Sequence, residues 1–146
     1  MPKVFVYGTL KKGYRNHPLL HDYGERSELL AEDSCEGVLY NTPYGFPAAV
    51  KGMGVIVGEV YEVTPETLKR LDRLEGHPQM YTRTEVKLDS GTKAFVYFWN
   101  GDPENYNGVK DEAEPGWKEL SEGVWPEVEI NEAESGWTEL SEGEDE

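Results

Sequence analysis

Short apolar runs in the first half of the chain predict β-strands. The first run, Lys3–Tyr7, is rich in β-branched and aromatic residues and is typical of a buried strand. Turn-forming residues separate three further predicted strands, at Gly37–Tyr40, Ala48–Val50 and Val55–Val63. The polar segment 11–34 is expected to form a loop or short helix whose leucines pack on the core. These leucines are Leu19, Leu20, Leu29 and Leu30.

A helix is predicted after the fourth strand. Thr64 suits the N-cap, Pro65 the first helical position, and Glu66 the positive end of the helix dipole. Leucines three residues apart then form an apolar stripe that should face the core. The stripe consists of Leu68, Leu71 and Leu74. Gly76 and Pro78 are expected to end the helix.

A β-hairpin is predicted next. Its strands are Tyr81–Leu88 and Thr92–Trp99, and Asp89-Ser90-Gly91 has the composition of a turn. Many strands and one or two helices within about 110 residues predict an α+β domain with a small, mixed, barrel-like sheet.

The net charge of −15 is concentrated toward the C-terminal end. Residues 1–110 carry 15 acidic and 13 basic side chains, whereas residues 111–146 carry 14 acidic side chains and one lysine. We therefore expect one domain at 1–110 and an acidic tail at 111–146. The domain lacks the basic surface that binds nucleic acid, and the tail would repel phosphate backbones and anionic lipid. Neither nucleic acid nor a membrane is expected as a partner.

Cysteine usage and the apolar runs bear on the location of the protein. Cys35 is the single cysteine, so no intrachain disulfide or cysteine-based metal site is expected. No apolar run approaches the ~20 residues of a membrane-spanning helix. Met1–Val4 leads directly into a strand without the apolar region of a signal peptide. These features predict a cytoplasmic protein.

The tail contains an internal repeat. DEAEPGWKELSEG at 111–123 recurs as NEAESGWTELSEG at 131–143, an offset of 20 residues. Its many charges and few apolar residues favour a solvated acidic extension. Three tryptophans in the tail favour instead a segment that docks on a protein partner, because a solubilising tail needs no tryptophan. They are Trp117, Trp125 and Trp137.

The turn after the first strand is a candidate ligand site. Tyr7-Gly8-Thr9-Leu10 is followed by the cations Lys11, Lys12 and Arg15. A glycine lets the chain turn tightly, so that several backbone N–H groups are exposed together. Such groups bind carboxylate or oxyanion oxygens. The turn therefore predicts a site for a small anionic ligand.

Glu75 is the candidate for proton transfer. It stands at the end of the predicted helix, near the negative end of the dipole and beside the apolar stripe. Both surroundings raise the pKa of a carboxyl group toward neutrality, where it serves as a base and then as an acid. The local pattern by itself favours an ordinary solvated glutamate.

Other candidate sites are weaker. His17 and His21 could share a helical face, but no third metal ligand is evident. Cys35 has acidic neighbours, which raise a thiol pKa, so it is not expected to be a nucleophile. The sequence has neither a P-loop nor the Gly-x-Ser-x-Gly motif of serine hydrolases.

Three stretches occur in the order and spacing of a known family. They are VFVYGTLKKG near the N-terminus, GEVYEV at 58–63 and LDRLEGHPQMYTRT at 71–84. With these stretches the chain resembles the γ-glutamyl cyclotransferase-like family, and most closely its γ-glutamylamine cyclotransferase branch. The resemblance spans about residues 3–99 and does not include the repeat.

The resemblance implies a small mixed barrel with packed helices and an assignment of site residues. Glu75 would be the catalytic acid and base, and the substrate-binding residues would be Tyr7, Gly8, Thr9, Leu10, Tyr81 and Tyr97. The implied substrate is a γ-glutamyl amine such as γ-glutamyl-ε-lysine. Its α-amine attacks its own γ-carbonyl, which releases 5-oxoproline and a free amine. This chemistry requires no cofactor and no metal.

Three alternatives stay open at this point. The leaving group could be an amine or an amino acid, and it would be bordered by residues 75–80 and the segment 11–34. The domain could instead be a non-catalytic γ-glutamyl-binding module that recruits a partner through its tryptophan-containing tail. The acidic tail could also fold over the site as a lid.

Overall fold

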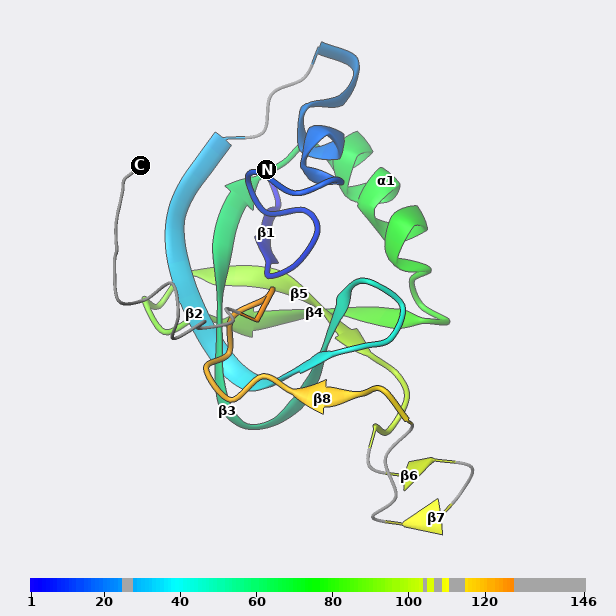
Figure 1. The fold of residues 1–146 in the computed structure, drawn as a ribbon. Helices are drawn as coiled ribbons and strands as arrows, with labels where there is room; N and C mark the ends of the chain where they lie inside the picture. The colour runs from blue at the N-terminus through cyan, green and yellow to red at the C-terminus, as the bar shows by residue number, and fades with distance from the viewer. Residues whose placement is uncertain (25–27, 104, 107–108, 111–114, 128–146) are drawn as a thin grey trace, which may run out of the picture.

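The computed structural model describes residues 1–24, 28–103, 105–106, 109–110 and 115–127. A mixed six-stranded sheet in the order β4-β5-β1-β3-β2-β8 curls into a half-barrel, and helix α1 lies on one side of it (Figure 1). This confirms the predicted α+β class with a curled sheet. Within the described residues, no helix is long and apolar enough to span a membrane.

The strands of the main sheet are β1 (Lys3–Val6), β2 (Glu28–Asn41), β3 (Pro47–Glu62), β4 (Tyr81–Lys87), β5 (Lys93–Trp99) and β8 (Lys118–Glu119). A separate pair consists of β6 (Asn105–Tyr106) and β7 (Val109–Lys110). The helices are the 3₁₀-helix η1 (His17–Gly24) and α1 (Pro65–Glu75).

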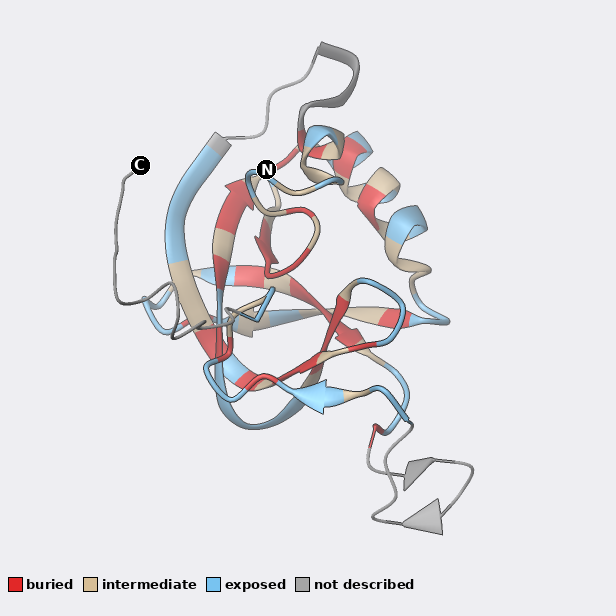
Figure 2. Cartoon of the chain, viewed as in Figure 1, coloured by how far each residue is buried: buried red, intermediate tan, exposed pale blue. Residues whose placement is uncertain are grey.

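Strand β1 is buried on both faces (Figure 2). It pairs antiparallel with β3 and parallel with β5. Val4 and Val6 belong to one core cluster, whereas Phe5 and the following Tyr7 belong to the other. The chain therefore leaves β1 at a firmly packed point, which is where the Tyr7–Leu10 turn begins.

Strands β2 and β3 are much longer than the sequence pattern predicted. The predicted strand at 37–40 is the last part of β2, and the strands predicted at 48–50 and 55–63 belong to a single strand, β3. Gly52 and Gly54 interrupt the apolar pattern but lie inside β3. A Cβ on Gly54 would lie 2.7 Å from the carbonyl oxygen of Gly37, so a glycine here permits close approach of the two strands.

The expected packing of two leucines was wrong. Leu20 is fully buried and Leu19 packs against a core cluster, as predicted. Leu29 and Leu30, however, lie on β2 and are exposed. This part of β2 pairs with β3, so backbone hydrogen bonds hold the strand although these two side chains are not buried.

Helix α1 has the predicted ends. Thr64 Oγ1 accepts the N–H of Thr67 at 3.0 Å, and Gly76 adopts a left-handed conformation (φ 65°) at the C-cap. The apolar stripe is only partly in the core. Leu71 is fully buried, but Leu74 is 40% exposed because it faces a cavity beyond the helix end.

Residues 115–127 pack on the sheet. Strand β8 pairs with the end of β2, and the N–H of Leu120 donates to the carbonyl of Leu39 at 2.8 Å. Leu120 is buried in a core cluster, and Trp125 Nε1 donates to Asn41 Oδ1 at 3.0 Å. This part of the predicted tail is therefore not a solvated extension. The second repeat copy, 131–143, lies outside the described residues.

We expect Leu71→Ala and Leu74→Ala to differ sharply in stability. The two leucines are one helical turn apart and undergo the same change, but only Leu71 leaves a cavity in the core. Leu71→Ala should lower the free energy of unfolding by about 2–5 kcal/mol and Leu74→Ala by less than about 1 kcal/mol. Urea unfolding measures both values, and equal losses would contradict this packing.

Candidate active site

A cavity of about 220 Å³ lies at the end of β1. The structure brings every predicted site residue to its lining: Tyr7, Gly8, Thr9, Leu10, Glu75, Tyr81 and Tyr97. They come from the turn after β1, the last residue of α1, β4 and β5. Their shared position is a structural fact, whereas their roles in binding and catalysis remain predictions.

The turn after β1 is fixed by its own hydrogen bonds. The Gly8 carbonyl accepts the N–H of Lys11 at 3.0 Å, and the Thr9 carbonyl accepts the N–H of Asn16 at 2.9 Å. Asn16 Nδ2 also donates to Thr9 Oγ1 at 2.8 Å. Within the described residues, the N–H groups of Gly8, Thr9 and Leu10 donate no hydrogen bond. These amides are thus available to a ligand, and exposed backbone N–H groups of this kind can bind anions.

Gly8 is required for a reason that the sequence did not reveal. A Cβ at this position would lie 2.6 Å from Cγ of Pro47, the first residue of β3. Such an approach is too close for any side chain. The turn therefore packs directly against β3, and Pro47 itself lines the cavity.

Glu75 ends α1 with its carboxylate toward the cavity. Burial raises the pKa of this carboxyl group from its ordinary value of 4.5 to about 7. Among the described residues, no side chain or backbone group forms a hydrogen bond or ion pair with it. The pKa is therefore raised as predicted, and burial is the cause that the structure shows.

Three tyrosines form the cavity wall, and each donates its hydroxyl to a protein acceptor. Tyr7 donates to the carbonyl of Tyr97 at 2.6 Å, and Tyr81 donates to the carbonyl of Pro47 at 2.8 Å. Tyr97 donates to Asp72 Oδ1 at 2.6 Å. Burial is the main cause that raises the pKa of all three, so they are neutral phenols.

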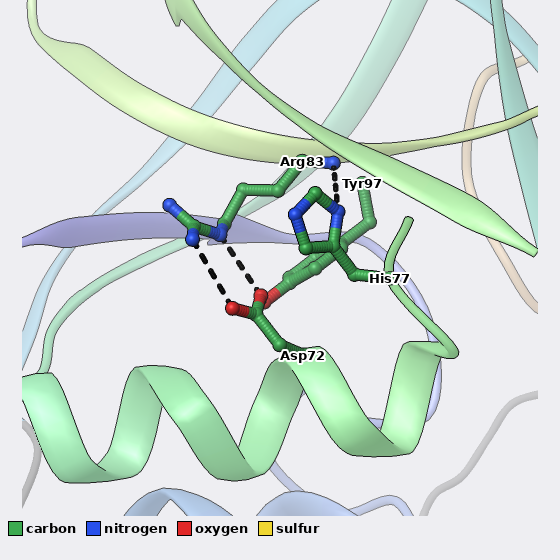
Figure 3. A network of polar contacts seen from close by, with 4 residues as sticks. All are labelled: Asp72, His77, Arg83 and Tyr97. Carbon is green, nitrogen blue, oxygen red and sulfur yellow. Dashed lines mark hydrogen bonds and ion pairs between the residues drawn. The ribbon is translucent and has the colours of Figure 1, made fainter. Parts of the chain in front are cut away.

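Asp72 is the centre of a polar network that includes Tyr97 of the cavity wall (Figure 3). Arg83 donates to its two oxygens from Nε at 2.8 Å and Nη2 at 3.1 Å. The backbone N–H of Arg83 donates in turn to His77 Nδ1 at 3.0 Å. The network joins α1, the turn after it, β4 and β5. It therefore holds the end of α1, and with it Glu75, against the sheet.

The remaining cavity residues had little signal in the sequence. Phe46 comes from the β2–β3 connection, Pro47 is the first residue of β3, and Leu74 had been assigned to the core stripe. Arg15 and Met80 lie in the two segments that were expected to border the leaving group. Arg15, Leu74 and Met80 are exposed and so lie at the cavity mouth. None of residues 115–127 lines the cavity, so this part of the tail does not form the lid considered above.

The candidates His17 and Cys35 have contacts that explain them structurally. His17 Nδ1 lies 3.0 Å from the carbonyl of Leu10, and its ring packs near Tyr61; the side chain of His21 lies outside the described residues. Cys35 is buried, and burial raises the pKa of its thiol to about 12. In the part of the chain that the structure describes, no group of three or more His, Cys, Asp or Glu residues could hold a metal ion.

Comparison with known families gives a match over residues 4–126. The matching family is described as gamma-glutamyl cyclotransferase, AIG2-like. The chain belongs to this family. The match extends beyond residue 99, where the recognised resemblance ended, and includes the packed segment 115–126.

Individual members of the γ-glutamyl cyclotransferase family share similar stretches. The gamma-L-glutamyl-butirosin B gamma-glutamyl cyclotransferase of Niallia circulans is 43% identical over 70% of this chain and 69% of its own length. The gamma-glutamylaminecyclotransferase of Mus musculus is 32% identical over 75% of this chain and 74% of its own. A crystal structure of an uncharacterised Pyrococcus horikoshii protein superposes with a TM-score of 0.63, at 34% identity, over 86% of this chain and 90% of that one.

Glu75→Gln should stabilise the fold at high pH. Because the pKa of Glu75 is raised in the folded protein, folding favours the protonated form, and stability falls as the pH rises from about 4.5 to about 7. The loss reaches up to about 3 kcal/mol. The variant should match the parent at pH 4 and exceed it at pH 8 in urea unfolding.

Glu85→Gln is the matched control, because Glu85 is exposed on β4. It should show no comparable gain at pH 8. If Glu75→Gln and the parent had the same stability at both pH values, the carboxylate would not be buried as described.

Proposed function

We propose that this chain cleaves a γ-glutamyl amine, such as γ-glutamyl-ε-lysine, into 5-oxoproline and the free amine. One observation carries the proposal: Glu75, whose carboxyl pKa is raised to about 7 by desolvation, lines the same cavity as the turn after β1 with its backbone N–H groups, which are unpaired within the described residues. Membership of the γ-glutamyl cyclotransferase family supports it. The two sides of the cavity suit the two tasks of such an enzyme, anion binding and proton transfer.

The turn after β1 would bind the glutamyl part. The N–H groups of Gly8, Thr9 and Leu10 are directed to no acceptor in the described chain and suit the substrate's α-carboxylate. Arg15 adds a positive charge at the cavity mouth. Holding the substrate in a folded shape brings its α-amine to its own γ-carbonyl, and well-oriented intramolecular reactions reach effective molarities of about 10⁵ M or more.

Glu75 would carry the proton. The substrate's α-amine is mostly an ammonium ion at neutral pH, and it attacks only after losing a proton to the Glu75 carboxylate. The amine nitrogen then bonds to the γ-carbon, the bond from that carbon to the leaving nitrogen breaks, and Glu75 returns the proton to the leaving nitrogen. The ring nitrogen gives up its second surplus proton, which the released amine takes up to become an ammonium ion. A pKa near 7 serves both transfers.

The leaving amine would occupy the apolar side of the cavity mouth. Leu74 and Met80 are each 40% exposed there, and Phe46 also lines the cavity. Apolar side chains of this kind suit the aliphatic arm of an amine such as the lysine side chain. The mouse relative is named a gamma-glutamylaminecyclotransferase, and this name supports a γ-glutamyl amine as the substrate. The Niallia circulans relative is named for another γ-glutamyl compound, γ-glutamyl-butirosin B, and supports the γ-glutamyl part.

Release of 5-oxoproline tests the proposal. Purified protein would receive γ-glutamyl-ε-lysine, γ-glutamyl amino acids and glutathione in parallel. We expect release from the first, at a rate that rises as Glu75 ionises around pH 7. Glu75→Gln should lower the rate by about 10²-fold or more while ligand binding persists, and Glu85→Gln should not.

The other outcomes are informative as well. Preferred release from a γ-glutamyl amino acid would keep the cyclotransferase but replace the amine as leaving group. A folded parent that binds γ-glutamyl compounds and releases nothing from any of them would instead be the binding module considered from the sequence.

Arg15 gives a second test of the substrate's orientation. Arg15→Gln should raise KM about tenfold or more and leave kcat less affected, because the lost charge contacts the substrate and not the reacting atoms. Lys12→Gln removes a charge from the same loop, but Lys12 does not line the cavity. Steady-state kinetics that show equal effects for the two variants would rule out the role of Arg15.

A further inference from the structure

The first repeat copy is held on the sheet by a small set of residues, here named the repeat seat: Leu39, Tyr40, Pro43, Val55 and Trp99. Leu39 accepts the N–H of Leu120. The rings of Tyr40 and Trp99 lie 6.0 Å and 5.4 Å from the ring of Trp117. The seat therefore binds the first copy through a buried leucine, Leu120, and a partly buried tryptophan, Trp117.

Two glycines of the first copy are required by the same seat. Gly116 has φ 91°, and a Cβ there would lie 3.0 Å from Cβ of Pro43. Gly123 has φ 71°, and a Cβ there would lie 1.9 Å from the carbonyl oxygen of Val55. Both positions thus need a glycine for backbone conformation and for space.

The second copy keeps every residue type that the seat requires. Gly136, Trp137, Leu140 and Gly143 stand 20 positions after Gly116, Trp117, Leu120 and Gly123. Between 112–123 and 132–143 only two positions differ, where Ser135 replaces Pro115 and Thr138 replaces Lys118. Pro115 and Lys118 are both exposed in the first copy. The differences therefore fall at positions that the seat does not enclose.

We propose that the repeat seat also accepts the second copy, residues 131–143, of the same chain in place of the first. Thr138 and Glu139 then take the pairing positions of Lys118 and Glu119 beside β2. The connection from β7 to the seat becomes 20 residues longer. Closure entropy grows only slowly with loop length, so the longer connection is a weak obstacle.

Trp125 distinguishes the two arrangements. It follows the first copy, and its Nε1 donates to Asn41 Oδ1. Its ring centre lies 5.4 Å from that of Tyr14, and its carbonyl oxygen accepts a hydrogen bond from Lys11 Nζ. At the equivalent place after the second copy stands Asp145. The first copy is therefore the preferred occupant of the seat. Exchange for the second copy would break the contacts of Trp125 with Lys11 and Tyr14, which lie in the loop after the Tyr7–Leu10 turn.

A double-mutant cycle in the full chain tests the exchange. Leu140→Ala alone should leave the melting temperature unchanged, because the first copy is seated. Leu120→Ala should lower it only in part, because the second copy replaces the first. The double variant should melt at least ~5 °C lower than Leu120→Ala. If Leu140→Ala has no effect in either background, the second copy does not enter the seat and the proposal fails.

Disulfide trapping gives a readout that does not depend on stability. Asn41 pairs with Lys118 when the first copy is seated, so Asn41→Cys with Lys118→Cys should cross-link as a positive control. Asn41→Cys with Thr138→Cys should cross-link within the monomer, and Leu140→Ala should suppress that product. No 41–138 cross-link, or one found only between two chains, would overturn exchange within one chain. Cys35 is buried and does not compete.

Discussion

The site depends on the two hydrogen bonds of Tyr97. Its hydroxyl donates to Asp72 on α1, and its carbonyl accepts the hydroxyl of Tyr7 at the end of β1, both at 2.6 Å. One residue of β5 thus contacts both the helix that ends in Glu75 and the strand that leads into the Tyr7–Leu10 turn; Figure 3 shows Tyr97 beside Asp72 of the helix. Arg83 neutralises the charge of Asp72 from the neighbouring strand. This junction adds a polar connection to the apolar core cluster in which Leu71 of α1 already packs with Val4 and Val6 of β1.

The parts of the fold that could be predicted are those with local signals. Thr64 and Gly76 cap α1 through contacts within a few residues, and the hairpin of β4 and β5 has its own turn. Strands β2 and β3 could not be predicted at their true length, because pairing with each other sustains them where side chains are exposed. Leu29 and Gly54 illustrate this. Leu29 is an apolar residue that lies exposed on its strand, and Gly54 is a glycine that lies inside a strand and not in a turn.

The candidate site was predictable to the extent that it lies in motifs. The Tyr7–Leu10 turn and Glu75 could be selected from the sequence, and the structure brings them to one cavity. The contact between Gly8 and Pro47, and the ion pair of Asp72 with Arg83, join residues far apart in the chain. No local pattern encodes such contacts. The packing of Leu120 was missed for the same reason, since an acidic segment shows its buried face only when its partner strand is known.

The residues that line the cavity come both from packed core strands and from turns. The turn proposed to bind the anion follows β1, which is buried on both faces, and is held by the contact of Gly8 with Pro47. Two other lining residues come from turns, Phe46 before β3 and Met80 before β4. Turns tolerate insertion and replacement better than core strands do. A scaffold of this kind can diversify its substrate range during evolution by altering these two turns, while the turn proposed to bind the glutamyl part is inherited unchanged.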